Sequence, residues 1–241
     1  MSRFDHCRLY PHDMLRIASA ADLCSAQPLP AWAYASLKTA RWVVVRRSLP
    51  YEGMVPVGVR GTSREQRFAA FLPIHAVLDR VTPEQLVHHG AWRWATRRAR
   101  DLPAFQALDL VCHIMSDFEL PWGPTGSVGF EIATGFPVAT LNSDLDLLIR
   151  APDELPRELC RRLSAQFSER LPARTDALIE TGTGAIALIE YAHGALPIVF
   201  RSPTGPKLVS RPWEITDECC LYFSRTGISG RGNVARSSGS S

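Results

Sequence analysis

Residues 122–150 constrain the fold most, because two aspartates interrupt a short apolar segment that follows a glycine-rich one. Asp144 and Asp146 alternate with leucine and isoleucine, the two-residue period of a half-buried strand. Side chains two positions apart on a strand point to the same face, so the two Cα atoms lie roughly 7 Å apart with both carboxylates on one side. The apolar residues anchor the other face in a core. The pattern predicts a metal-binding pair of acids at the edge of a sheet.

The composition is that of an ordinary soluble globular protein. The 241 residues allow one large domain or two small ones, and 46% of them are hydrophobic against 21% charged. The first residues carry charges and no apolar run, and no window approaches the ~20 apolar residues of a membrane span. We therefore expect no signal peptide, a cytoplasmic location, and no membrane or nucleic-acid partner.

Cysteine and arginine usage narrows the chemistry further. The six cysteines form no C-x-x-C pair, which argues against a structural zinc site. Of the 27 basic residues only Lys38 and Lys207 are lysine. Arginine side chains suit phosphate or carboxylate partners, although genome composition alone could produce the same bias.

The first third of the chain predicts a small N-terminal α+β domain over residues 1–80. It contains a short helix at 12–17 and an antiparallel pair of strands at 42–46 and 55–59. Residues 64–72 follow a glycine turn as either a third strand or a short helix.

Residues 81–215 predict a second domain in which helices cover a mixed sheet. A capping sequence at 82–85 starts a helix that should run to about residue 100. Gly and Ser are frequent after residue 216, so we expect 216–241 to be a disordered tail. Further helices are expected after Pro103 and from Pro152, and strands at 175–180, 185–191 and 196–201.

The central segment resembles the nucleotidyltransferase superfamily, which includes polymerase β and small antibiotic-modifying enzymes. The shared feature is a glycine-serine pair followed by D-x-D on a strand. A narrower resemblance, to the phosphoribosyl-dephospho-CoA transferase family, covers the chain from Met1 to about Ile215. The matching segments are G-P-T-G-S-V-G-F-E-I-A-T-G-F-P-V, S-D-L-D-L-L-I-R, H-D-M-L-R, W-V-V-V-R-R, V-P-V-G-V-R-G and T-G-P-K-L-V-S-R-P-W.

This family comprises the holo-acyl-carrier-protein synthases of bacterial malonate decarboxylase. The resemblance implies a polymerase-β-like nucleotidyltransferase domain that transfers a group from 2′-(5″-triphosphoribosyl)-3′-dephospho-CoA to a serine of the apo acyl carrier protein, with release of diphosphate. Asp144 and Asp146 would be catalytic and would bind Mg²⁺, which prefers one or two carboxylates plus phosphate oxygens. Gly126 and Ser127 would bind the phosphates through backbone N–H groups.

A third carboxylate is expected on a neighbouring strand, where Asp176 and Glu180 are the candidates. Asp176 fits the superfamily position better, although Thr175 stands before it where an apolar residue is usual. It would bind the metal or accept the serine proton. The alternative is an acid exposed at a strand end. Glu131 could orient the glycine segment, contact ribose or cap a helix.

Several cations could neutralise the triphosphate. Arg150 and Lys207 are the substrate-binding candidates, and Arg201, Arg60 and Arg64 are further ones. Each of these could instead be a surface residue.

Two other functions are compatible with the sequence. One is transfer of a nucleoside monophosphate to another acceptor by the same fold. The other is a non-catalytic module that binds a carrier protein through arginines. The intact pair of aspartates argues against the module, which has no physical need for two like charges so close together.

Overall fold

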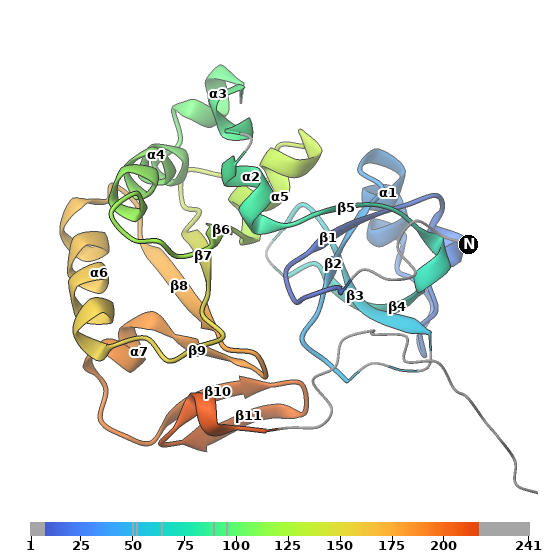
Figure 1. Cartoon of the computed structure of the whole chain (residues 1–241). Helices are drawn as coiled ribbons and strands as arrows, with labels where there is room; N and C mark the ends of the chain where they lie inside the picture. Colours follow the sequence, from blue (N-terminus) through green and yellow to red (C-terminus); the bar gives the residue numbers. More distant parts are fainter. Residues whose placement is uncertain are drawn as a thin grey trace, which may run out of the picture.

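The structure, a computed structural model, describes residues 8–216 except for 50, 52, 64, 89 and 95. It has an α+β fold with two sheets (Figure 1). The expected tail, apart from residue 216, and the candidate Arg64 lie outside the described residues. No helix in the described part is both long and apolar enough to span a bilayer.

The first sheet has five antiparallel strands in the order β4-β3-β2-β1-β5. Helix α1 covers one of its faces (Figure 1), where Ala33 and Leu37 are buried with strand residues such as Val43 and Val57. The elements of this half are β1 (Met14–Ile17), the 3-10 helix η1 (Ala20–Asp22), α1 (Ala31–Thr39), β2 (Trp42–Val45), β3 (Met54–Arg60), β4 (Arg67–Pro73), η2 (Ile74–Ala76) and β5 (Val77–Val81).

The second sheet has six strands in the order β11-β10-β9-β8-β7-β6. Strands β7 and β8 run parallel and the other neighbours antiparallel, so the sheet is mixed. Its strands are β6 (Trp122–Pro124), β7 (Leu145–Arg150), β8 (Thr175–Glu180), β9 (Ala185–Ala187), β10 (Ile198–Ser202) and β11 (Gly205–Val209). Its helices are α2 (Pro83–His88), η3 (Ala91–Trp94), α3 (Arg97–Arg100), α4 (Pro103–Met115), α5 (Gly126–Thr134), α6 (Arg157–Arg170), α7 (Leu188–His193) and η4 (Pro212–Glu214).

The core of the second half forms between β7 and the helices. Leu145, Leu147 and Ile149 are buried with Leu108 of α4 and Leu163 of α6, so the predicted apolar face of the aspartate strand is confirmed. This face fixes β7 rigidly, and Asp146 points away from the core.

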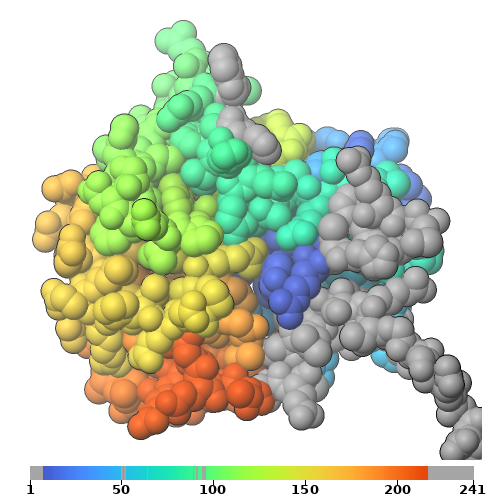
Figure 2. Space-filling view, in the orientation of Figure 1, coloured from blue at the N-terminus to red at the C-terminus, as the bar shows by residue number. Residues whose placement is uncertain are grey.

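A smaller apolar cluster joins the two halves. Met14 of β1 and Ala40, which follows α1, pack with Leu86, Phe130 and Val138. Figure 2 shows the start of the described chain, in dark blue, where the two halves meet. This apolar cluster holds one face of the first sheet opposite the second sheet.

Two expected helices have a different structure. Residues 12–17 were expected to be helical, but they contain strand β1, whose Met14 pairs with Val44 on one side and Val81 on the other. Two flanking strands satisfy the backbone of this segment, which outweighs its local helical pattern. The expected helix from 82 to 100 divides into α2, η3 and α3, since Gly90 has a left-handed φ of 59°.

The remaining differences are local. The predicted cap is confirmed, because Thr82 N donates to Gln85 Oε1 at 2.8 Å and Gln85 N to Thr82 Oγ1 at 3.3 Å. The expected strand at 185–191 ends at Ala187, and α7 follows, where Glu190 Oε1 accepts from Val199 N at 2.9 Å. Short apolar runs fit a strand or a helix equally, so periodicity could not separate the two.

Candidate active site

Strands β7 and β8 bring two of the predicted acids side by side. Asp146 and Asp176 are direct partners in the parallel register, and Asp144 lies one residue before β7. The pKa of Asp146 is raised above its ordinary value, first by burial and then by the negative charges of Asp176 and Asp144. Arg60 and Arg67 pull that pKa in the other direction. Asp144 and Asp176 therefore act electrostatically on Asp146 where β7 and β8 begin.

Gly126 touches the carboxylate of Asp146. It opens α5 with a left-handed φ of 58°, and a Cβ built there would lie 1.9 Å from Asp146 Oδ2. Thr125 N donates to the Asp146 backbone oxygen at 2.8 Å and holds the turn against β7. The segment expected as a loop is thus the first turn of a helix, and Ser127 is buried in it.

A cavity of about 880 Å³ opens at Asp146 and Asp176, whereas Asp144 is not among its described lining residues. Gly126, Asp146 and Asp176 line it from the second sheet and its helix, and Arg60 and Arg67 line it from the first sheet. Acids and arginines therefore face one another across the same space. Such a cavity suits a phosphorylated ligand whose charge is shared between a metal and arginine side chains.

The donor set fits a divalent cation that a substrate helps to bind. Among the described residues, no group of three or more His, Cys, Asp or Glu side chains forms a ready-made metal site. Magnesium, however, usually takes only one or two carboxylates and completes its shell with phosphate oxygens and water. A cation between Asp144 and Asp146 would also relieve the repulsion that raises the pKa of Asp146.

Glu131 anchors the segment that leads to Asp144. Its Oε2 accepts hydrogen bonds from Val138 N at 2.9 Å and Ala139 N at 2.8 Å, and its Oε1 pairs with Arg98 at 2.9 Å. The side chain is buried. Of its possible roles, the structure supports the positioning one, because these contacts tie α5 to the chain before the aspartates.

The structure separates the two candidates for the third carboxylate. Asp176 lies beside Asp146 at the cavity and pairs with Arg174 at 3.2 Å on the surface. Glu180, at the other end of β8, is buried and receives two hydrogen bonds from Arg47, one of them 2.6 Å long. Of the two candidates, Asp176 lines the cavity and Glu180 does not.

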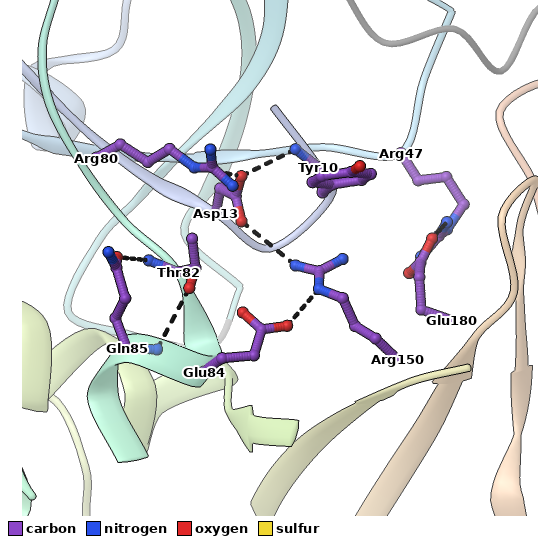
Figure 3. A network of polar contacts seen from close by, with 9 residues as sticks. All are labelled: Tyr10, Asp13, Arg47, Arg80, Thr82, Glu84, Gln85, Arg150 and Glu180. Atoms are coloured by element: carbon purple, nitrogen blue, oxygen red, sulfur yellow. Dashed lines mark hydrogen bonds and ion pairs between the residues drawn. The ribbon is translucent and has the colours of Figure 1, made fainter. Parts of the chain in front are cut away.

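Arg150, a predicted substrate-binding residue, is not brought to the cavity. Figure 3 shows it between the two halves, where it pairs with Glu84 through Nε and with Asp13 through Nη2 at 3.4 Å. Its guanidinium lies 4.9 Å from the centre of the Tyr10 ring. The side chain is only 17% exposed, and its charge is paired with the carboxylates of Asp13 and Glu84.

Of the other predicted cations, some line the cavity and others do not. Lys207 lies on β11 opposite Phe200, is exposed, and does not line the cavity. Arg60 and Arg201, which were secondary candidates, do line it.

His12 is a cavity residue to which the sequence assigned no role. It lines the cavity, has a left-handed φ of 73°, and is half-buried. Burial, followed by Arg47, Arg150 and Arg201, lowers the pKa of His12 to about 3, so its imidazole is neutral near pH 7. The H-D-M-L-R segment contains it, but no local pattern shows that three arginines from distant parts of the chain act on it.

Fold and site together define an α+β protein with a cavity in which aspartates and arginines face each other. Two family models match the chain: the phosphoribosyl-dephospho-CoA transferase MdcG N-terminal domain over residues 10–83 and the corresponding C-terminal domain over residues 91–212. The chain belongs to the phosphoribosyl-dephospho-CoA transferase family.

Curated relatives agree with this assignment. The proteins named phosphoribosyl-dephospho-CoA transferase from Pseudomonas fluorescens and Azotobacter vinelandii are each 41% identical to the chain, and each match covers 84% of the chain and 93% of the relative. The protein of the same name from Pseudomonas aeruginosa is 39% identical over 86% of the chain and 95% of the relative. No solved structure matches the chain.

Proposed function

We propose that this protein transfers the phosphoribosyl-dephospho-CoA group from its triphosphate precursor to a serine of the apo acyl carrier protein of malonate decarboxylase, releasing diphosphate. The family and the names of the relatives support the transferred group. The observation that carries the proposal is the pairing of Asp146 with Asp176 beside Gly126, in a cavity that arginines close from the other side. The proposal includes a division into an N-terminal domain at 1–80 and a nucleotidyltransferase-like catalytic domain at 81–215.

The proposed reaction is an in-line displacement at the α-phosphorus of the triphosphate. The serine oxygen of the carrier forms a new P–O bond, the bond between the α-phosphorus and its bridging oxygen breaks, and the electron pair leaves with diphosphate. Asp176 lies at the cavity and is half-exposed, so it is positioned to accept the serine proton or to bind a metal. Mg²⁺ held by Asp144 and Asp146 would polarise the phosphoryl oxygens and offset developing charge.

Arginines of the first sheet are positioned to hold the leaving group. Arg60 and Arg67 are partners in the β3–β4 register, line the cavity, and are close enough to affect Asp146. Burial lowers the pKa of Arg60 to about 10, so it still carries its charge near pH 7. Two fixed cations opposite the acids would stabilise the diphosphate as it departs.

The test replaces each aspartate of the strand by its isosteric amide. Asp144→Asn and Asp146→Asn should each lower diphosphate release and the mass shift of the apo carrier by more than about 100-fold, because a metal ligand is lost. Asp117→Asn changes an exposed aspartate after α4 and should leave the rate unchanged. Circular dichroism and the thermal midpoint check that all three variants fold.

A second experiment identifies the substrate that donates the transferred group. The protein is incubated with apo carrier and either the triphosphoribosyl precursor or ATP, and the carrier is weighed by mass spectrometry. Labelling by the precursor alone supports the proposal. Labelling by ATP alone would assign the chain to nucleoside monophosphate transfer, and full turnover by either aspartate variant would rule out the proposed roles of these acids.

A further inference from the structure

A second cavity of about 620 Å³ lies next to the first and extends between the first sheet and the β10–β11 hairpin. Both cavities are lined by His12, Arg60, Arg67 and Arg201, so they are continuous around these side chains. The mechanism proposed above uses only the end near the aspartates. The larger part of this second space has no assigned ligand.

The floor of the second cavity is formed by short side chains of three neighbouring strands. Val44 pairs with Gly58, and Gly58 pairs with Ala69, so these three residues lie side by side on the sheet face that is turned away from α1. A Cβ at Gly58 would lie 3.4 Å from the Cγ and Cδ atoms of Arg46. The stem of Arg46 therefore crosses the floor at Gly58, where a larger residue would displace it.

The rim of this cavity is strongly cationic. Its described lining residues include no Asp or Glu, and its arginines are Arg46, Arg47, Arg60, Arg67 and Arg201. Arg47 is already paired with Glu180. Nε of Arg60 is buried and has no hydrogen-bond partner in the described part of the chain. A buried donor without a partner is costly, and an anionic ligand would supply the acceptor.

The two cavities therefore favour anions in different ways. The first combines aspartates with arginines and suits a phosphate group bound through a cation. The second has arginines without carboxylates, so it suits a phosphate group bound directly by guanidinium groups.

We propose that the second cavity binds the adenosine diphosphate part of dephospho-CoA, with the base against Val44 and Ala69 beside the stem of Arg46 and the diphosphate at the guanidinium groups of Arg46 and Arg201. This inference rests on the proposed function, whose substrate carries a reactive triphosphate and, separately, the diphosphate of its dephospho-CoA part. The neutral imidazole of His12 lies where the two cavities meet and can hydrogen-bond uncharged groups between the two anions.

The experiment measures binding of dephospho-CoA by calorimetry in EDTA, without any divalent cation. The full chain should bind it, and ADP should bind at the same site while pantetheine alone should not. Arg46→Gln removes one guanidinium and should weaken binding of both nucleotides about tenfold or more. Ala69→Leu adds bulk to the floor and should weaken them similarly without changing charge.

The control is Arg41→Gln, which makes the same charge change on an exposed arginine next to β2 that does not line the cavity. It should alter affinity by less than about twofold, since a distant exposed charge is largely screened. Thermal midpoints of all variants check folding. No binding without a divalent cation, or binding by Arg46→Gln and Ala69→Leu as tight as that of the wild type, would overturn the proposed subsite.

Asp146→Asn separates this proposal from the transfer reaction. It should abolish transfer but retain metal-free binding of dephospho-CoA, because the second cavity contains no aspartate. Loss of that binding in Asp146→Asn would contradict two separate subsites. Full transfer by Asp146→Asn would contradict the catalytic role alone.

Discussion

The contact between Gly126 and Asp146 shows how single residues constrain this site. The left-handed φ of Gly126 and the 1.9 Å that would separate a Cβ from Asp146 Oδ2 both require glycine. Gly135 also has a left-handed φ, of 70°, but a Cβ there would meet nothing within 4 Å. Substitution of Gly135 therefore tests backbone strain alone, whereas substitution of Gly126 tests backbone strain together with contact to Asp146.

We predict that Gly126→Ala lowers the transfer rate by at least about tenfold, since the added methyl must displace the carboxylate of Asp146. Gly135→Ala should cost about 1 kcal/mol of stability through its backbone and leave the rate unchanged. Urea unfolding and steady-state kinetics measure the two effects. Equal rates for both variants would show that the contact does not matter for the reaction.

His12 should make the stability of the protein depend on pH. Its pKa falls from 6.5 in the unfolded chain to about 3 in the folded protein, so the folded state binds fewer protons between these values. Its contribution to stability is therefore complete above pH 6.5 and is lost as the pH falls. Neighbouring Asp13, whose pKa burial raises to about 6, acts in the opposite direction.

His12→Asn tests this, because asparagine tolerates the left-handed backbone. Between pH 7 and pH 5 the wild type should lose about 2 kcal/mol of unfolding free energy more than the variant does. The contribution of Asp13 is common to both proteins and cancels in the comparison. Parallel pH profiles would mean that His12 is not held neutral by the fold.

Among the elements, α5 matters as a support for the chain that presents Asp144. Glu131 of α5 accepts the backbone N–H groups of Val138 and Ala139 and so fixes the segment after the helix. Both N–H groups would be left without this acceptor if the carboxylate were removed, at a cost of about 1–3 kcal/mol for each. The segment before Asp144 would then shift while the core stays folded.

We predict that Glu131→Ala lowers kcat about tenfold and weakens the dependence of the rate on Mg²⁺, with a smaller effect for Glu131→Gln, whose amide oxygen can still accept. The loss follows from misplacing Asp144 by a fraction of an ångström to an ångström. Glu119→Ala, at an exposed glutamate, is the control. A change in KM for the carrier alone would instead indicate a docking role for Glu131.

At the scale of the whole molecule, a buried ionic network joins the two sheets (Figure 3). Asp13 is fully buried and pairs with Arg80 at 2.8 Å and with Arg150 at 3.4 Å, while Arg150 also pairs with Glu84. Arg150 belongs to the second sheet and Asp13 precedes β1 of the first. The network therefore fixes how the two halves face each other across the cavities.

Arg150→Met should accordingly destabilise the protein by about 3 kcal/mol, because it leaves Asp13 and Glu84 with one counter-ion fewer in a buried place. KM for the precursor should remain within about twofold. Arg161→Met, in an exposed pair with Glu158, should cost about 0.5 kcal/mol or less. A large rise in KM with unchanged stability would restore Arg150 as a substrate-binding residue.

The sequence by itself determined the local features of the site. The two-residue period around Asp144 and Asp146 predicted a strand with its apolar face buried, and β7 has that structure. The sequence also predicted a strand at residues 175–180 that carries Asp176, and β8 matches those bounds. Both inferences depend only on residues close together in the chain, where backbone geometry sets which side chains share a face.

Only the tertiary structure decided which charges act together. Arg47 pairs with Glu180 across 133 positions of sequence, and Arg150 pairs with Asp13 across 137. Charge energies depend on distance and burial in space, and no local period records these. The same reason explains why Arg150 was expected at the substrate, why His12 was not recognised, and why the arginine-lined second cavity became visible only once the two sheets were placed face to face.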